Sequence, residues 1–179
     1  MLLEEARFQF NVSTPDVAER EDIHLTAREL TGWNAVRKGL LVARRHPDHT
    51  ILSADTVVSL HGRIIGKPAD LPDAIQILQR LSGKTHEVYS SVFVAYLAES
   101  KANLVWEVSQ VRFRALSAAQ IREYLGKINP LDKAGGYAAQ GYGAEIITRI
   151  EGSYSNVVGL PMEQTTKVLR QFGIRPKET

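Results

Sequence analysis

The spacing of hydrophobic residues alternates along the chain between the periods of helices and strands. The first long helical stretch opens with a capping-box pattern, Thr26 followed by Glu29, and ends at the His-Pro pair at positions 46–47. Asn34 and Lys38 lie four residues apart and share one face of this predicted helix. Its recurring apolar positions are Trp33, Val36, Leu40 and Ala43.

Three later segments also carry helix boundary signals. Asp70 caps the first at its start, and Gly83 ends it in the left-handed position. Ser117 and Gln120 form the capping box of the second, short helix. The third is amphipathic and spans residues 161–173, opening at a proline and closing at a glycine. The apolar stripe of the first of these helices consists of Ala74, Ile77, Leu78 and Leu81.

Runs rich in β-branched residues predict the strands. HTILSADTVVSL and RIIG read as two strands joined by a His61-Gly62 hairpin turn. HEVYSSVFVAYL and LVWEVSQVRFRAL read as a second strand pair. A glycine-rich segment over residues 132–161 separates the last two helices. Alternation of helices and strands without internal repeats predicts the α/β class.

Composition limits the size of the core, the possible metal ligands and the possible partners of the protein. A chain of 179 residues with 44% apolar content can form one core or at most two small lobes. Without cysteine, a metal ion would have to bind oxygen or imidazole ligands. The net charge of +2 does not favour a surface that coats nucleic acid, and no apolar run approaches the ~20 residues of a membrane span. The N-terminal residues lack the pattern of a secretory signal. We therefore expect a cytoplasmic protein without nucleic-acid or membrane partners.

Asp55 stands where an apolar run gives way to β-branched residues. Taken alone, this carboxylate is better explained by bonding to nearby backbone, and Lys38 and Lys67 are better explained as solvent-exposed side chains. Taken together, a carboxylate at a strand end and two cations suit metal-assisted phosphoryl chemistry.

Two other features are weaker. Glycines over residues 135–143 suggest a phosphate-cradling loop, but the G-x-x-x-x-G-K-[ST] order is missing and such turns are commonly structural. His86 has no second histidine at ligand spacing, so we interpret it as a structural histidine and assign it no metal.

The blocks SADTVV, GKP, LSGKTHEV and DKAGGYAAQGYGAEIITRIEGSYSNVVGLP, in this order, resemble the Maf family of nucleoside triphosphate pyrophosphatases over nearly the whole chain. The resemblance implies one domain over residues 1–179. The implied fold is a two-lobed α/β Maf/ITPase-like fold, with a central twisted mixed sheet flanked by helices and a nucleotide cleft between the lobes. It also implies a homodimer, and hydrolysis of a nucleoside triphosphate substrate to the monophosphate and pyrophosphate.

The same resemblance assigns roles to individual residues. Asp55 matches the family's catalytic proton acceptor. Glu19, in PDVAERE, matches the acidic residue that would hold a divalent cation, Mg²⁺ or Mn²⁺, together with Asp55. Lys38 and Lys67 match the basic residues expected to contact the triphosphate.

Thr56 and Gln140 match two positions tied to base choice, and this pair resembles the subgroup that acts on dTTP and UTP. A hydroxyl and an amide can each donate and accept hydrogen bonds at a pyrimidine edge. Asp132 and Lys133 match the family's D-K-A-G block, for which a buried ion pair and direct ligand contact both remain open.

The sequence departs from the family pattern in two places. Family members usually have a strand and an S-x-S-P-R-R loop, which contacts the triphosphate, ahead of the segment that matches LLEEARFQF. Two interpretations stay open: a start assigned too late, or a shortened member with weak or no activity. In addition, Ser90 and Ser91 stand where the family more often shows Thr and Gly.

Three function classes therefore remain. The first is an active pyrophosphatase, and the second is a catalytically silent nucleotide-binding protein. The third is a structural interaction module, which would be favoured if the charged side chains were scattered over the surface.

Overall fold

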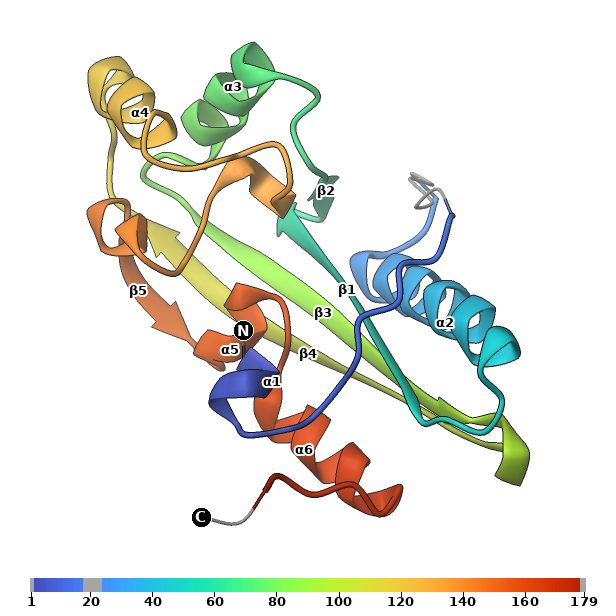
Figure 1. The fold of residues 1–179 in the computed structure, drawn as a ribbon. Helices are drawn as coiled ribbons and strands as arrows, with labels where there is room; N and C mark the ends of the chain where they lie inside the picture. Colours follow the sequence, from blue (N-terminus) through green and yellow to red (C-terminus); the bar gives the residue numbers. More distant parts are fainter. Residues whose placement is uncertain (1, 18–23, 178–179) are drawn as a thin grey trace.

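The computed structural model of the chain describes residues 2–17 and 24–177, and Glu19 therefore lies outside the described residues. Its centre is a five-stranded sheet in the order β2-β1-β3-β4-β5 (Figure 1). The strands are β1 (Ile51–Leu60), β2 (Arg63–Ile65), β3 (Thr85–Tyr96), β4 (Lys101–Phe113) and β5 (Ile147–Glu151). The α/β class is confirmed.

The expectation of a mixed sheet is wrong, because every pair of neighbouring described strands is antiparallel. A two-residue turn joins β1 to β2, and the short 3₁₀ turn Leu97–Glu99 joins β3 to β4, so the chain reverses at both places. β2 and β3 do run in the same direction, but they pair with opposite edges of β1 and never meet as parallel neighbours.

Helices cover both faces of the sheet (Figure 1). One face carries α2, and α5 and α6 pack against β3 and β4, on the side of the sheet away from α2. α3 and α4 lie together at one end of the sheet. Within the described residues, no helix has the length and apolar character that a membrane span needs. The helices are α1 (Leu2–Glu5), α2 (Ala27–Arg45), α3 (Leu71–Leu81), α4 (Ala118–Leu125), α5 (Tyr154–Val158) and α6 (Met162–Gln171).

The predicted local signals are confirmed. Both capping boxes form, at the starts of α2 and α4, and the Asp70 side chain accepts the Asp73 N–H at the start of α3. In the β1–β2 hairpin, His61 and Gly62 have φ angles of 51° and 77°, which is the left-handed pair that a two-residue hairpin turn requires. The glycine-rich segment contains a strand and an α-helix that the sequence did not predict, β5 and α5.

The apolar stripe predicted for α2 is partly wrong, because Trp33 is 52% exposed. Small residues instead let the helix approach the sheet closely. A Cβ atom added to Gly39 would lie 2.5 Å from Phe93 Cδ1. Close backbone approach therefore decides which side of α2 is buried, and the large indole is left outside.

Two separate apolar clusters lie on the face of the sheet opposite α2. One packs α3 and α4 against Val58 and Val88, and the other packs α6 against Val92 and Val94. Between them, the paired strand residues are Thr56 and Ser90. Alternation along β1 and β3 places all of these side chains on one face. The polar pair therefore lies between two lobes that have their own apolar cores.

Candidate active site

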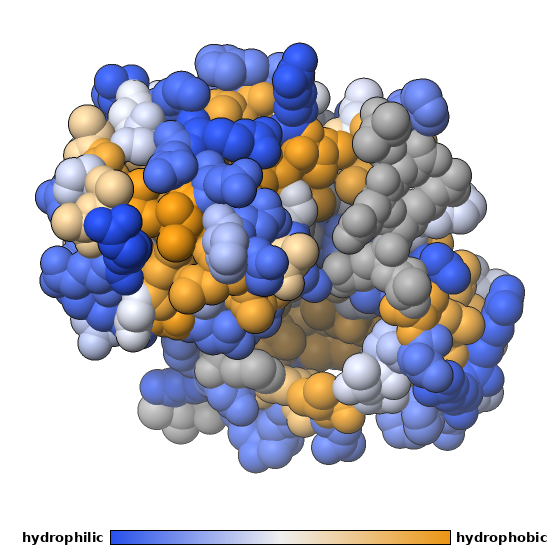
Figure 2. All heavy atoms as spheres, turned by 90° about the horizontal axis from the view of Figure 1, so that it is seen from above, coloured by the Kyte–Doolittle hydropathy of each residue, from blue (hydrophilic) through white to orange (hydrophobic). Residues whose placement is uncertain are grey.

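A cavity of about 390 Å³ lies between the two lobes. Asp55 and Thr56 reach it from β1, Lys38 from α2, Lys67 from the segment after β2, and Gln140 from the glycine-rich loop. Seen from the α3 and α4 end, the molecule is hollowed, with apolar residues on the floor of the hollow (Figure 2). The structure thus brings together all the sequence-predicted site residues that it describes.

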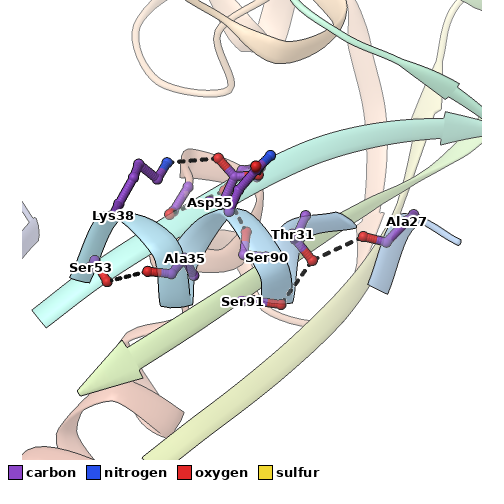
Figure 3. Close-up of polar contacts among 11 residues, drawn as sticks. Ala27, Thr31, Ala35, Lys38, Ser53, Asp55, Ser90 and Ser91 are labelled. Atoms are coloured by element: carbon purple, nitrogen blue, oxygen red, sulfur yellow. Dashed lines mark hydrogen bonds and ion pairs between the residues drawn. The ribbon is translucent and has the colours of Figure 1, made fainter. Parts of the chain in front are cut away.

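Asp55 is only 7% exposed and is held by two side chains of α2. Lys38 Nζ lies 2.7 Å from Asp55 Oδ1, and Asn34 Nδ2 donates to Asp55 Oδ2 at 3.2 Å. Figure 3 shows the Lys38 side chain extending from α2 toward the Asp55 carboxylate. A buried carboxylate needs such partners, and these two fix its orientation. The spacing of Asn34 and Lys38 placed them on one face, but sequence reasoning assigned Asn34 no role.

Two hydroxyls beneath the same helix tie it to the sheet. Ser53 Oγ donates to the Ala35 carbonyl oxygen at 2.7 Å, and the Ser91 and Thr31 hydroxyl oxygens are 2.8 Å apart (Figure 3). Asn34 and Lys38 are on this helix, so these bonds fix the distance of both side chains from Asp55.

Asp132 and Lys133 line the cavity near Gln140. Lys133 Nζ lies 2.8 Å from Asp132 Oδ1, so the ion pair considered from the sequence does form. It is not buried, because the Asp132 side chain is 59% exposed. The loop is instead held by backbone contacts such as the bond from Gly135 N–H to the Gly66 carbonyl, which leaves the charged pair open to solvent and to a ligand.

The Thr56 hydroxyl belongs to a chain of hydrogen bonds that sequence reasoning missed. Thr56 Oγ1 lies 2.8 Å from Ser90 Oγ and 3.3 Å from the Gly159 carbonyl oxygen. Ser90 Oγ in turn donates to the Asn156 carbonyl oxygen at 3.2 Å, and Asn156 Nδ2 donates to Ser109 Oγ at 2.9 Å. The chain connects the cavity wall to α5.

The sequence profile of the family described as "Maf-like protein" matches residues 1–172. This chain belongs to the Maf family. It is 38% identical over 175 residues to the dTTP/UTP pyrophosphatase of Bacillus pumilus (strain SAFR-032), with 98% of this chain and 92% of the relative covered. It is 39% identical over 173 residues to the dTTP/UTP pyrophosphatase of Bacillus anthracis (strain CDC 684 / NRRL 3495), covering 97% and 90%. The protein of that name from Bacillus cereus (strain AH187) gives the same values.

In this Maf-family chain, His86 supports the cavity wall from behind. The imidazole is 1% exposed, and its Nε2 lies 2.8 Å from the hydroxyl of Tyr137, which lines the cavity. Burial lowers the pKa of His86 to about 4 and raises the pKa of Tyr137. The His86 ring also packs edge-on against Phe113. These contacts are those of a structural histidine.

The metal assignment depends on Asp55 and Glu19, and only Asp55 is described. No group of three or more His, Cys, Asp or Glu side chains suited to a metal ion exists within residues 2–17 and 24–177. Mg²⁺ and Mn²⁺ favour oxygen ligands, and Mg²⁺ is often held by one or two carboxylates together with substrate phosphates. The Asp55 carboxylate fits that pattern, because the cavity also has three lysines, Lys38, Lys67 and Lys133, that could hold the substrate phosphates.

Proposed function

We propose that this Maf-family protein is a nucleoside triphosphate pyrophosphatase that hydrolyses dTTP and UTP to the monophosphate and pyrophosphate. The observation that carries the proposal is the convergence of Asp55, Thr56, Lys38, Lys67 and Gln140 on one cavity. The activity named for the three relatives supports the same substrate class. The position of these side chains in one cavity also disfavours a purely structural module, for which charged side chains scattered over the surface were expected.

The cavity residues divide the chemistry among them. Lys38 and Lys67 are cations that would bind the triphosphate, and the three donors of Lys38 allow it to contact a phosphate while it stays bonded to Asp55. Thr56 and Gln140, on the wall beside them, would contact the base.

Hydrolysis requires a water oxygen to attack the α-phosphorus while the bond to the oxygen bridging the α and β phosphates breaks. Asp55 would accept the proton that the water loses, and the oxygen that leaves carries its electron pair away on pyrophosphate. Lys38 and Lys67 would stabilise the negative charge that gathers on the phosphate oxygens. A bound Mg²⁺ or Mn²⁺, held by Asp55 and Glu19, would supply further charge neutralisation.

The test is pyrophosphate release from the common nucleoside triphosphates with Mg²⁺ or Mn²⁺, comparing the wild type with Asp55→Asn. Loss of a general base typically costs ~10²–10⁴-fold, and the amide keeps the size of the side chain, so activity should fall by at least ~10²-fold with the fold retained. Asp48→Asn, at an exposed carboxylate, is the matched control. Turnover by Asp55→Asn near the wild-type rate would reject the assignment. Binding of dTTP without pyrophosphate release by the wild type would favour the catalytically silent alternative.

The proposal includes a homodimer. Four large apolar side chains are more than a third exposed beside α2, and burial of such a surface is a common driving force for association. In solution, light scattering should give twice the 19.9 kDa mass of one chain, and a monomer at micromolar concentration would contradict it. The four residues are Trp33, Leu104, Trp106 and Val108.

We also propose a cytoplasmic location and no nucleic-acid partner. The cysteine-free composition and the net charge of +2 support them. Cell fractionation tests the first. Retention of the protein on immobilised DNA or RNA at physiological salt would contradict the second.

A further inference from the structure

We infer that Ser90 is a specificity-determining residue, because it fixes the direction of the Thr56 hydroxyl so that the cavity accepts pyrimidines with an N3–H and rejects cytosine. This inference deepens the proposed function and rests on it. Ser90 is fully buried on β3, directly across from Thr56 in the strand pairing. It lies behind Thr56 and positions it rather than touching the nucleotide.

The hydrogen bonds leave few choices for the two hydroxyl protons. Each hydroxyl has one proton, and the 2.8 Å separation of Thr56 Oγ1 and Ser90 Oγ requires one proton between them. If Ser90 donates to the Asn156 carbonyl, Thr56 must donate to Ser90. If Ser90 donates to Thr56, the Thr56 proton goes to the Gly159 carbonyl.

Both arrangements keep the Thr56 proton inside the protein. Only oxygen lone pairs of Thr56 then face the cavity, so the side chain acts there as an acceptor. Each arrangement contains two hydrogen bonds, one between the hydroxyls and one to a backbone carbonyl. Turning the Thr56 proton toward a ligand would leave only the bond between the hydroxyls, and this loss disfavours any ligand that needs a donor at this position.

Gln140 cannot provide this discrimination by itself. It is exposed, and its side-chain amide makes no hydrogen bond to any other described residue. An amide that is free to rotate can present either its oxygen or its NH₂ group. It can therefore pair with the O4 atom of uracil or thymine and equally with the exocyclic amine of cytosine.

Uracil and cytosine differ in the group on C4 and, as a consequence, in whether N3 carries a proton. N3 of uracil and thymine carries a proton and donates to an acceptor, whereas N3 of cytosine accepts. An acceptor-only Thr56 thus favours UTP over CTP without a change in ring size. A site that leaves a buried polar group unpaired with the wrong ligand discriminates strongly against it.

The experiment compares kcat/KM for UTP and CTP in the wild type, Ser90→Ala and Ser90→Thr. Without the Ser90 hydroxyl, Thr56 keeps only the longer bond to Gly159, and its proton can turn to cytosine N3. The UTP/CTP ratio should fall by about tenfold, the value of one hydrogen bond of about 1.4 kcal/mol. Ser90→Thr retains a hydroxyl on the same carbon and should keep the wild-type ratio.

Ser91→Ala is the matched control. Ser91 is the next residue on β3 and is equally buried, but its hydroxyl lies 2.8 Å from Thr31 on the α2 side, away from Thr56. It should not change the ratio. In a Thr56→Val background, which lacks the oriented hydroxyl, adding Ser90→Ala should have no further effect on the ratio.

Titration with non-hydrolysable α,β-imido analogues of UTP and CTP gives the same comparison as a ratio of Kd values, independently of turnover. An unchanged Kd ratio in folded Ser90→Ala overturns the inference, as does a fall in the ratio in Ser90→Thr. An absence of pyrophosphate release by the wild type would instead refute the proposed function, so the two failures are distinguishable.

Discussion

Replacing His86 with glutamine tests how a buried imidazole couples pH to the stability of this fold. The ring is 1% exposed, bonded to the Tyr137 hydroxyl, and packed between Phe113 and Tyr137 with ring-centre distances of 4.9 and 5.4 Å. Burial disfavours the charged form, which lowers the pKa of His86 from 6.5 to about 4. In the folded protein, His86 is therefore neutral at pH values where an unfolded chain would protonate it.

The sign of the effect follows from proton binding. Between pH 6.5 and about 4, the unfolded chain holds the His86 proton and the folded chain does not, so folding stability falls as the pH falls through this window. The difference between the two pKa values, multiplied by about 1.36 kcal/mol per unit, gives a loss of about 3 kcal/mol in the free energy of unfolding. The loss begins near pH 6.5 and is complete once the pH reaches about 4.

The assay is urea unfolding of the wild type and His86→Gln at several values between about pH 7 and about pH 4. Glutamine can place an amide near the position of Nε2 but does not titrate. Its baseline stability will be lower because ring packing is lost, so the comparison is between pH dependences. The wild type should lose about 3 kcal/mol more than His86→Gln over this range.

His61→Asn is the control, because His61 is exposed in the hairpin turn, where asparagine also tolerates the left-handed conformation. This variant should retain the wild-type pH dependence. Parallel curves for the wild type and His86→Gln would refute the reasoning, since they would mean that His86 binds its proton equally in the folded and unfolded states.

Other predictions concern the cavity and helix α2. Lys67→Ala should lower kcat/KM for dTTP by the equivalent of ~1.5–3 kcal/mol, the value of a charge-assisted contact, and unchanged kinetics would remove Lys67 from the triphosphate site. Gln140→Glu should reduce kcat/KM for dTTP and UTP more than for ATP; equal losses would exclude a role in base choice. Gly39→Ala should destabilise by about 1–3 kcal/mol in thermal unfolding, because the added carbon would meet Phe93 at 2.5 Å. Gly32→Ala, whose added carbon meets nothing closer than 3.5 Å, should instead stabilise by up to about 1 kcal/mol, and equal effects would refute the packing argument.

The sequence by itself determined the starts of helices α2 and α3 and the turn between β1 and β2. The capping box of Thr26 and Glu29, the cap at Asp70 and the left-handed pair at His61 and Gly62 satisfy backbone groups within a few residues of themselves. Such contacts form in nearly any tertiary setting, so residue type and spacing suffice to predict them. The family motifs likewise identified five side chains that line one cavity, from Lys38 to Gln140.

Tertiary structure decided how those side chains are held. Asn34 bonds to Asp55 across 21 positions, Ser90 to Thr56 across 34, and His86 to Tyr137 across 51. Each bond depends on strand register and on how closely a helix approaches the sheet, and local periodicity contains neither quantity. Helix packing also explains why the large Trp33 side chain is exposed. The small residue Gly39 allows α2 to approach Phe93 closely, so the opposite side of the helix faces solvent. Residue identity supplied the reactive groups, whereas the packing of distant segments fixed their orientation.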